Sequence, residues 1–351
     1  MAYEGKKYTC NPKYVYQYIY ERNQNLQHVW VLEDKETNEL KNKKNTSIVN
    51  KNSVQFFYHF LTAKVVISNA SIPTYIPLRR KQKYIETWHG GGAYKKTGLS
   101  YDQSELQIKK LKLLAQEVTL FISSSEIFTE TKSKNHIVER EKFFEIGMPR
   151  NDILFKGSKD LSNKVKDYYN LDREKKIVLY APTYRTKNDD SATYEDLDMT
   201  GLVKALEEKF GGDWVVFTRM HYYLNEKLQY KDAVNASSYP DMQELMLATD
   251  ALITDYSSVM WDFSLTKKPA FVFAPDLEEY EKNRSFFTPP EKWPFTIVKN
   301  NEELVNEIGR FDQQKHEKSI AEHHENQGSF EDGTATEKVF EKIMIYTDQV
   351  S

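Results

Sequence analysis

The sequence has a single cysteine, Cys10, among its 351 residues, and it has no long hydrophobic run. One cysteine excludes a disulfide framework and is typical of a reducing compartment. No stretch of about 18 apolar residues occurs, and residues 1–20 lack the apolar core of a signal peptide, so we expect no membrane-spanning helix. Zinc-ligand spacing, a Walker loop and a dinucleotide fingerprint are missing too, so we expect no metal and no cofactor.

The overall charge is also small, with a net of −3 at pH 7, which argues against a nucleic-acid binder. That average conceals two different halves. Residues 1–150 contain 24 Lys or Arg against 15 Asp or Glu, a net charge of +9. Residues 151–351 contain 25 against 37, a net charge of −12. The length and this difference together predict two domains that meet different partners.

Short apolar runs alternate with helix-like stretches along the chain, which predicts an α/β fold with parallel sheets and helical crossovers in each half. Ser125 is the expected N-cap of one helix. The strands expected in the first half are 28–33, 65–69, 84–88, 120–124 and 143–146. The strands expected in the second half are 177–181, 214–220, 251–255, 270–274 and 295–298.

The break between the halves is expected within residues 147–171. It divides the chain into domains 1–150 and 151–333, with a C-terminal helix in 334–351 that can pack back on the first domain. The polar tail 312–333 is expected to wrap the surface, with His323 and His324 exposed.

Paired doubly wound domains bind ligands in the central cleft, outside the carboxyl ends of their strands. His89 lies at such a strand end and is followed by Gly90, Gly91, Lys95 and Lys96. Glycines expose backbone N–H groups to an anion, and a His can take a proton from a hydroxyl. A flexible turn with a surface His is the alternative interpretation.

Two strands of the second half end beside cations. Thr183 and Arg185 follow one strand, and Arg219 and His221 end another. Arginine binds phosphate oxygens through two parallel hydrogen bonds, which favours a phosphate site. A solvated loop cation and a structural His are the alternatives.

Two further strands lead into polar loops. Ser257 and Ser258 lie at an expected helix start, where free N–H groups can hold a pyrophosphate, although N-capping requires no ligand. Pro275, Asp276 and Glu279 follow the next strand and can contact a ribose or a base, or only begin a solvated helix.

In this order the segments resemble the CDP-glycerol glycerophosphotransferase family, the teichoic acid primases and polymerases of Gram-positive bacteria. The resemblance covers nearly the whole chain, from Gly5 to Gly333. At Gly91-Gly92 many members have Thr-Pro, so the acceptor loop is looser here. A strand usually precedes Gly5, so upstream residues can be missing. The motifs are Trp88-His89-Gly90 with Lys95-Lys96, Gly147-x-Pro149-Arg150-Asn151-Asp152, Tyr180-Ala181-Pro182-Thr183-x-Arg185 and Thr254-Asp255-Tyr256-Ser257-Ser258.

The resemblance implies a GT-B-like fold, in which two Rossmann-type doubly wound domains face a central cleft. It implies a phosphotransferase that moves glycerol phosphate, or ribitol phosphate, from a CDP-activated donor to an undecaprenyl-diphosphate-linked acceptor and releases CMP. Domain 1–150 then takes the acceptor, with Gly90, Gly91, Lys95 and Lys96 on that side, and domain 151–333 takes the nucleotide.

The resemblance also assigns His89 and His221 as the catalytic pair. It makes Arg185 and the Ser257-Ser258 segment phosphate ligands, to which we add Thr183 and Arg219. In our hypothesis His89 is the general base, and the other groups stabilise charge on the pyrophosphate. A glycosyltransferase that uses a nucleotide sugar and a binding module for anionic polymer remain as alternatives.

Basic clusters at 79–83 and 109–112 give the first half its charge. They predict a peripheral enzyme that works at anionic lipids on the cytoplasmic face of the membrane. Solvated helix faces are the alternative. Donor alditol, chain length, acceptor and oligomeric state stay open.

Overall fold

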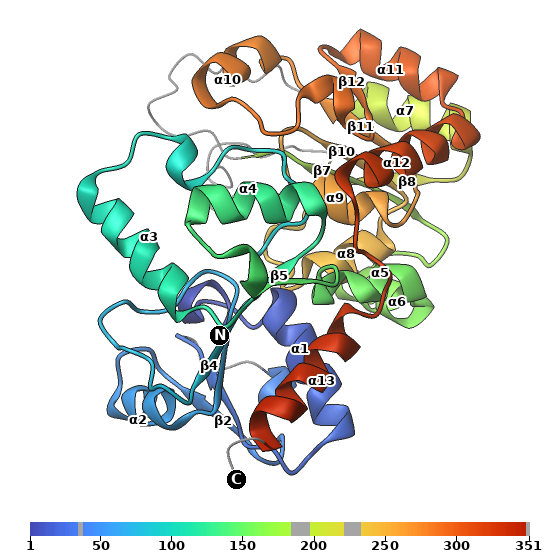
Figure 1. Cartoon of the computed structure of the whole chain (residues 1–351). Coiled ribbons are helices and arrows are strands. Elements are labelled where there is room, and N and C mark those ends of the chain that lie inside the picture. The colour runs from blue at the N-terminus through green and yellow to red at the C-terminus, as the bar shows by residue number, and fades with distance from the viewer. Residues whose placement is uncertain (34–37, 184–196, 221–232, 349–351) are drawn as a thin grey trace. The chain divides into compact units, whose positions relative to one another are not determined.

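The computed structural model describes residues 1–33, 38–183, 197–220 and 233–348 (Figure 1). Its strands pair in parallel in all three sheets, which confirms the predicted α/β fold. Contacts divide the chain into two compact units. The first unit consists of Met1–Gly91, Thr97–Phe155 and Gly328–Ser351, and the second of Gly92–Lys96 and Lys156–Gln327.

The first unit contains a two-stranded sheet, β1-β2, and a four-stranded sheet, β3-β4-β5-β6. The strands are β1 (His28–Val31), β2 (Thr46–Val49), β3 (Val65–Ser68), β4 (Lys83–Glu86), β5 (Leu120–Ser123) and β6 (Phe143–Glu145). The helices are α1 (Cys10–Arg22), α2 (Val54–Thr62), α3 (Glu105–Glu117), α4 (Glu126–His136), α5 (Asp152–Lys156) and α13 (Ala335–Asp348). Short 3-10 turns are η1 (Tyr3–Gly5), η2 (Asn38–Leu40), η3 (Gly98–Ser100), η4 (Arg140–Lys142) and η5 (Pro149–Asn151).

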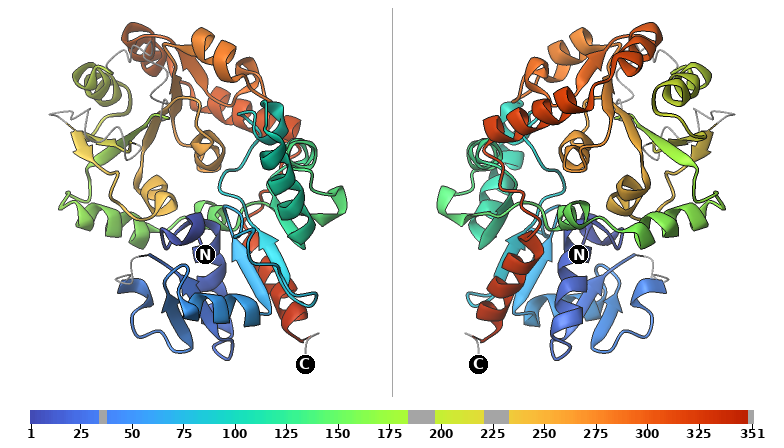
Figure 2. Two further views of the ribbon diagram at one scale, coloured as in Figure 1. Left: turned by 90° about the vertical axis from the view of Figure 1, so that its left-hand side faces the viewer. Right: turned by 90° about the vertical axis from the view of Figure 1, so that its right-hand side faces the viewer.

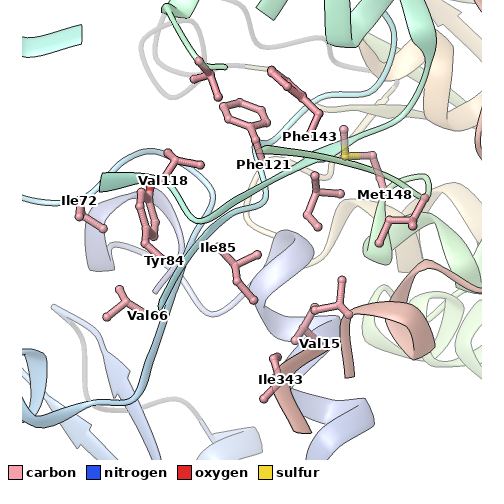
Figure 3. Close-up of a cluster of buried hydrophobic side chains, with 14 of the residues drawn as sticks. Val15, Val66, Ile72, Tyr84, Ile85, Val118, Phe121, Phe143, Met148 and Ile343 are labelled. Carbon is pink, nitrogen blue, oxygen red and sulfur yellow. The ribbon is translucent and has the colours of Figure 1, made fainter. Parts of the chain in front are cut away.

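The core of the first unit joins residues that are far apart in the sequence. Ile85 of β4 is fully buried beside Val15 of α1 and Ile343 of α13 (Figure 3). The neighbouring Tyr84, also fully buried, points to the other face of the strand, where it lies by Val118 and Ile72. The final helix α13 packs along α1 and β3, and Figure 2 lets the reader follow it there. At the start of α4, Ser125 Oγ accepts the Phe128 N–H at 3.1 Å, which confirms the predicted N-cap.

The second unit contains one six-stranded sheet in the order β12-β11-β10-β7-β8-β9. The order reverses between β7 and β10, which is the switch point at which doubly wound sheets bind ligands. The strands are β7 (Lys176–Ala181), β8 (Trp214–Thr218), β9 (Ala233–Asn235), β10 (Ala251–Thr254), β11 (Ala270–Phe273) and β12 (Thr296–Val298). The helices are α6 (Lys159–Tyr168), α7 (Met199–Phe210), α8 (Met242–Ala248), α9 (Val259–Ser264), α10 (Leu277–Arg284), α11 (Asn301–Arg310) and α12 (Gln313–Gln327), with the 3-10 turn η6 (Pro290–Lys292).

The prediction that the two histidines of the polar tail are exposed was wrong. Its residues form the 15-residue helix α12, and His323 is only 3% exposed. His323 Nδ1 donates to the Lys292 carbonyl at 2.8 Å, which leaves Nε2 to accept the Tyr94 hydroxyl at 2.8 Å. His324 Nε2 lies 2.7 Å from Ser264 Oγ. The two histidines therefore stabilise the second unit from inside.

Candidate functional site

His89 follows β4 and is held in one tautomer. Its Nδ1 lies 2.7 Å from the carbonyl oxygen of Asn69. A carbonyl only accepts, so Nδ1 carries the proton and Nε2 presents a lone pair. Burial, with smaller effects of Arg150 and Lys132, lowers the pKa of His89 to about 4. The ring is therefore neutral at pH 7, in the form that can accept a proton.

The backbone around His89 is held by two buried side chains of the first unit, Asn11 and Arg150. Arg150 donates to the His89 carbonyl at 2.8 Å. The Asn11 amide donates to the carbonyls of Thr87 and Trp88, both at 2.9 Å. Asn11 Oδ1 in turn accepts the Arg150 N–H at 3.0 Å. These two buried side chains hold the strand end in place, a function that the sequence did not reveal.

A cluster of ionisable side chains surrounds Trp88. The Lys132 ammonium lies 3.8 Å from the centre of the indole ring and donates to Thr97 Oγ1 at 3.0 Å. Burial lowers the pKa of Lys132 to about 7, although the Glu86 carboxylate opposes the change. The Trp88 ring stacks on His89 with ring centres 4.6 Å apart. Lys132 and the candidate base His89 therefore both contact the Trp88 ring.

The glycine loop after His89 passes into the second unit. Gly90 and Gly91 are buried, while Gly92 has a φ of +66°. The Tyr94 carbonyl accepts the Phe287 N–H at 2.7 Å. Lys95, which we predicted on the acceptor side, groups with the second unit and lies 5.6 Å from the centre of the Tyr280 ring. Lys96 is half-buried beside it in the chain.

At the switch point, Asp255 connects the carboxyl ends of β7 and β10. Each of its carboxylate oxygens accepts the Thr183 N–H at 2.9 Å, and one also accepts the Thr183 hydroxyl. Asp255 is 3% exposed. Thr183, predicted to bind phosphate, therefore organises the strand ends here. Asp255 belongs to the motif Thr254-Asp255-Tyr256-Ser257-Ser258. Its position directly after a buried strand was the signal that could have identified it as the residue that connects the two strand ends.

Ser257 and Ser258 are half-buried at the same edge of the sheet. Ser257 Oγ accepts the Val259 N–H at 3.3 Å, and Ser258 is the N-cap residue of α9 without a side-chain capping bond. Arg219 donates to the carbonyls of Ala236 at 3.0 Å and Tyr239 at 2.8 Å. Its guanidinium is thereby anchored close to the end of β8.

The loop after β11 carries the predicted nucleotide contacts. Asp276 accepts the Tyr256 hydroxyl at 2.7 Å, and the Tyr256 and Tyr280 rings stack 3.9 Å apart. Pro275 and Glu279 are half-buried. Arg185 and His221 lie outside the described residues. The structure therefore gathers Thr183, Ser257 and Ser258 at the ends of β7 and β10 and Asp276 at the end of β11.

Neither a metal-binding cluster nor a membrane-spanning helix occurs in the described part of the chain. No group of three or more His, Cys, Asp or Glu side chains there is arranged to hold a metal ion. None of its helices is long and apolar enough to cross a membrane.

The sequence profile of the CDP-Glycerol:Poly(glycerophosphate) glycerophosphotransferase family matches residues 1–345. The chain belongs to this family. A teichoic acid poly(glycerol phosphate) polymerase of Bacillus spizizenii is 29% identical over 98% of the chain, which covers 90% of that relative. A polymerase of the same description from Staphylococcus epidermidis is also 29% identical, and there the chain spans about half of the relative, 49%.

A solved structure of the family resembles this one along its whole length. The wall teichoic acid polymerase TagF is 28% identical and has a TM-score of 0.87, with 100% of this chain and 89% of the TagF chain covered. The likeness agrees with an α/β fold built on parallel sheets.

Proposed function

We propose that this glycerophosphotransferase transfers glycerol phosphate from CDP-glycerol to a hydroxyl of a lipid-linked acceptor, in the synthesis of wall teichoic acid or a related surface polymer. CMP is the leaving product, and CDP-ribitol is the alternative donor. The family match over residues 1–345 carries the proposal. The GT-B-like arrangement, with two Rossmann-type domains facing a central cleft, belongs to it, with the acceptor at the first domain and the nucleotide at the second.

His89 acts as the general base in this proposal. The acceptor oxygen attacks the β-phosphorus of CDP-glycerol in line, Nε2 takes the hydroxyl proton, and the bond to CMP breaks with its electron pair on the CMP oxygen. Support comes from the Nδ1 hydrogen bond, which directs the lone pair to Nε2. A bound anionic pyrophosphate raises the pKa of His89 from its value of about 4, because it stabilises the imidazolium.

The second unit stabilises the charge of the donor. His221, Arg185, Ser257 and Ser258 are the groups proposed for the pyrophosphate and the departing CMP. Positioning and electrostatics carry most of the catalysis in phosphoryl transfer, so no covalent intermediate is needed. Thr183 and Arg219, at the same strand ends, are proposed as further phosphate ligands of the donor. Asp276, Pro275 and Glu279 are proposed for the nucleoside. Gly90, Gly91, Lys95 and Lys96 are proposed for the acceptor, with the two lysines on its phosphate.

Peripheral binding to an anionic membrane surface completes the proposal, with the first unit as the membrane-facing part. Helix α3 exposes Leu106 and Leu113, at 77% and 52%, together with Lys109, Lys110 and Lys112. Apolar side chains beside lysines are the pattern of a helix that lies in a membrane interface. The excess of positive charge in residues 1–150 favours anionic lipids.

The experiment that tests the function supplies CDP-glycerol, CDP-ribitol or UDP-sugars with a lipid-linked acceptor and follows nucleotide release. Release of CMP from CDP-glycerol or CDP-ribitol supports the proposal and identifies the donor. Release of UDP would instead indicate a glycosyltransferase, and no release from any donor would indicate a binding module. If His89→Ala released CMP as fast as the parent, the assignment of the base would be wrong.

A further inference from the structure

Glu86, the last residue of β4, is a buried carboxylate at the base of the His89 loop, with an exposed fraction of 4%. Its Oε1 accepts the Trp88 N–H at 2.9 Å. Its Oε2 accepts the Ser71 N–H at 2.9 Å and the Tyr84 hydroxyl. The carboxylate thus joins the residue just before His89 to the loop that follows β3.

Both backbone N–H groups held by Glu86 belong to strained residues. Trp88 has a φ of +54° and Ser71 a φ of +69°, in the left-handed region that residues other than glycine rarely adopt. Such conformations persist only where the surroundings over-determine them, and they concentrate at functional sites. The hydrogen bonds from Glu86 are one such constraint on each residue.

The two strained segments are the ones that orient His89. Trp88 precedes His89 and stacks on its ring, with centres 4.6 Å apart. Asn69, two residues before Ser71, supplies the carbonyl that accepts Nδ1–H at 2.7 Å. One carboxylate is therefore hydrogen-bonded to both of the segments that contact the His89 ring, although it does not touch the imidazole.

From this geometry we infer that Glu86 is a positioning residue, which keeps His89 in the Nδ1–H tautomer with Nε2 available for proton transfer. The importance of Glu86 for catalysis rests on the proposed function, whereas its effect on the His89 tautomer does not. The tautomer of a histidine is set by the hydrogen bond of its other ring nitrogen, which here goes to the Asn69 carbonyl. Glu86 acts on that arrangement indirectly, through the N–H groups of Ser71 and Trp88.

Glu86→Gln is the substitution that tests this inference. A glutamine has the same shape, but its amide nitrogen cannot accept a hydrogen bond, so either the Trp88 or the Ser71 N–H loses its partner. Glu145→Gln is the matched control, because Glu145 ends β6 of the same sheet and bonds to Thr129 Oγ1 and the Arg140 guanidinium instead. Glu86→Asp draws the carboxylate back by one methylene, so its oxygens no longer reach both N–H groups, and we expect a mixture of tautomers there too. Thermal melts establish that each variant is folded.

The first measurement is the ¹⁵N NMR spectrum of protein labelled in histidine, with His89→Ala used to assign the His89 signals. We expect one tautomer with a protonated Nδ1 in the parent and in Glu86→Gln a mixture of tautomers. The second measurement is CMP release, where we expect kcat to fall about 100-fold with a KM for CDP-glycerol within about twofold of the parent, as for a misplaced catalytic group. Glu145→Gln should match the parent in both.

The outcomes separate the inference from the proposed function. If Glu86→Gln and Glu86→Asp both kept the single tautomer, or if Glu145→Gln disturbed it equally, the inference would be overturned. If Glu86→Gln did not fold, the His89 tautomer in Glu86→Asp would be the test, and a tautomer identical to the parent's would overturn the inference. A parent that releases no CMP would refute the proposed function, while the spectra would still test the positioning.

Discussion

Gly92, three residues after His89, is a position where a single methyl group should be damaging. Its φ of +66° costs an alanine about 1–2 kcal/mol. An added Cβ would also lie 2.7 Å from Tyr94 Cε2 and 2.9 Å from Trp261 Cε3. Both rings are buried, so they cannot move away, and overpacking adds about 1–3 kcal/mol. We therefore expect Gly92→Ala to lower the free energy of unfolding by about 2–5 kcal/mol.

Gly157 provides the control for this prediction. It belongs to the same unit, has a φ of +60°, and no atom lies within 4 Å of a Cβ built there. Gly157→Ala should therefore lose only the backbone contribution of about 1–2 kcal/mol. Urea unfolding of the second unit, followed by tryptophan fluorescence, measures both. Equal losses in the two variants would show that the two rings do not confine Gly92, and the reasoning would fail.

Three other changes test different features. Asp255→Asn weakens charge-assisted hydrogen bonds to Thr183, so the second unit should lose about 1.5–3 kcal/mol in urea unfolding, and no loss would contradict the geometry. Burial lowers the pKa of His323 and of His324 to about 4, so below pH 6.5 the unfolded state binds more protons than the folded state. The free energy of unfolding should therefore fall as the pH is lowered from 6.5 to 4. In His323→Phe the free energy of unfolding should depend less steeply on pH. Exchanging Lys109, Lys110 and Lys112 for Gln should weaken binding to phosphatidylserine vesicles about 100-fold at low salt, because each lysine contributes about 1 kcal/mol of binding free energy. Vesicle sedimentation measures the binding, and an unchanged bound fraction would exclude α3 as the membrane contact.

The sequence pattern predicted much of the fold because its signals are local. Apolar runs identified most strands, and Ser125 identified the start of α4, since strand burial and helix capping depend on neighbouring residues. Strands β2 and β9 were missed, because their sequences, Thr-Ser-Ile-Val and Ala-Val-Asn, include polar residues and are only partly buried, so they show no apolar run. Helix α12 was missed for a different reason: its stabilising contacts, such as His323 with Tyr94, connect residues 229 positions apart.

The candidate site was predictable to the level of motifs. Residues after strand ends were correctly expected at sheet edges, because parallel strands share one carboxyl edge. Their partners were not predictable. Glu86 reads as an ordinary strand residue, and only the folded chain shows that its oxygens meet the amides of Ser71 and Trp88. Whether Lys95 serves the donor or the acceptor likewise depends on contacts with a segment 185 positions later, at Tyr280.

The discontinuous first unit has a consequence for how the protein is made. Val339 and Ile343 of α13 belong to the same core as Val15, and Asp152 accepts the Ala335 and Thr336 N–H groups. A ribosome therefore releases the whole second unit before it supplies the last piece of the first. Domains usually fold in the order of their synthesis. Here the amino-terminal half should wait, incompletely packed, until α13 has been synthesised, and His89 should acquire its final surroundings only after the second unit has been made.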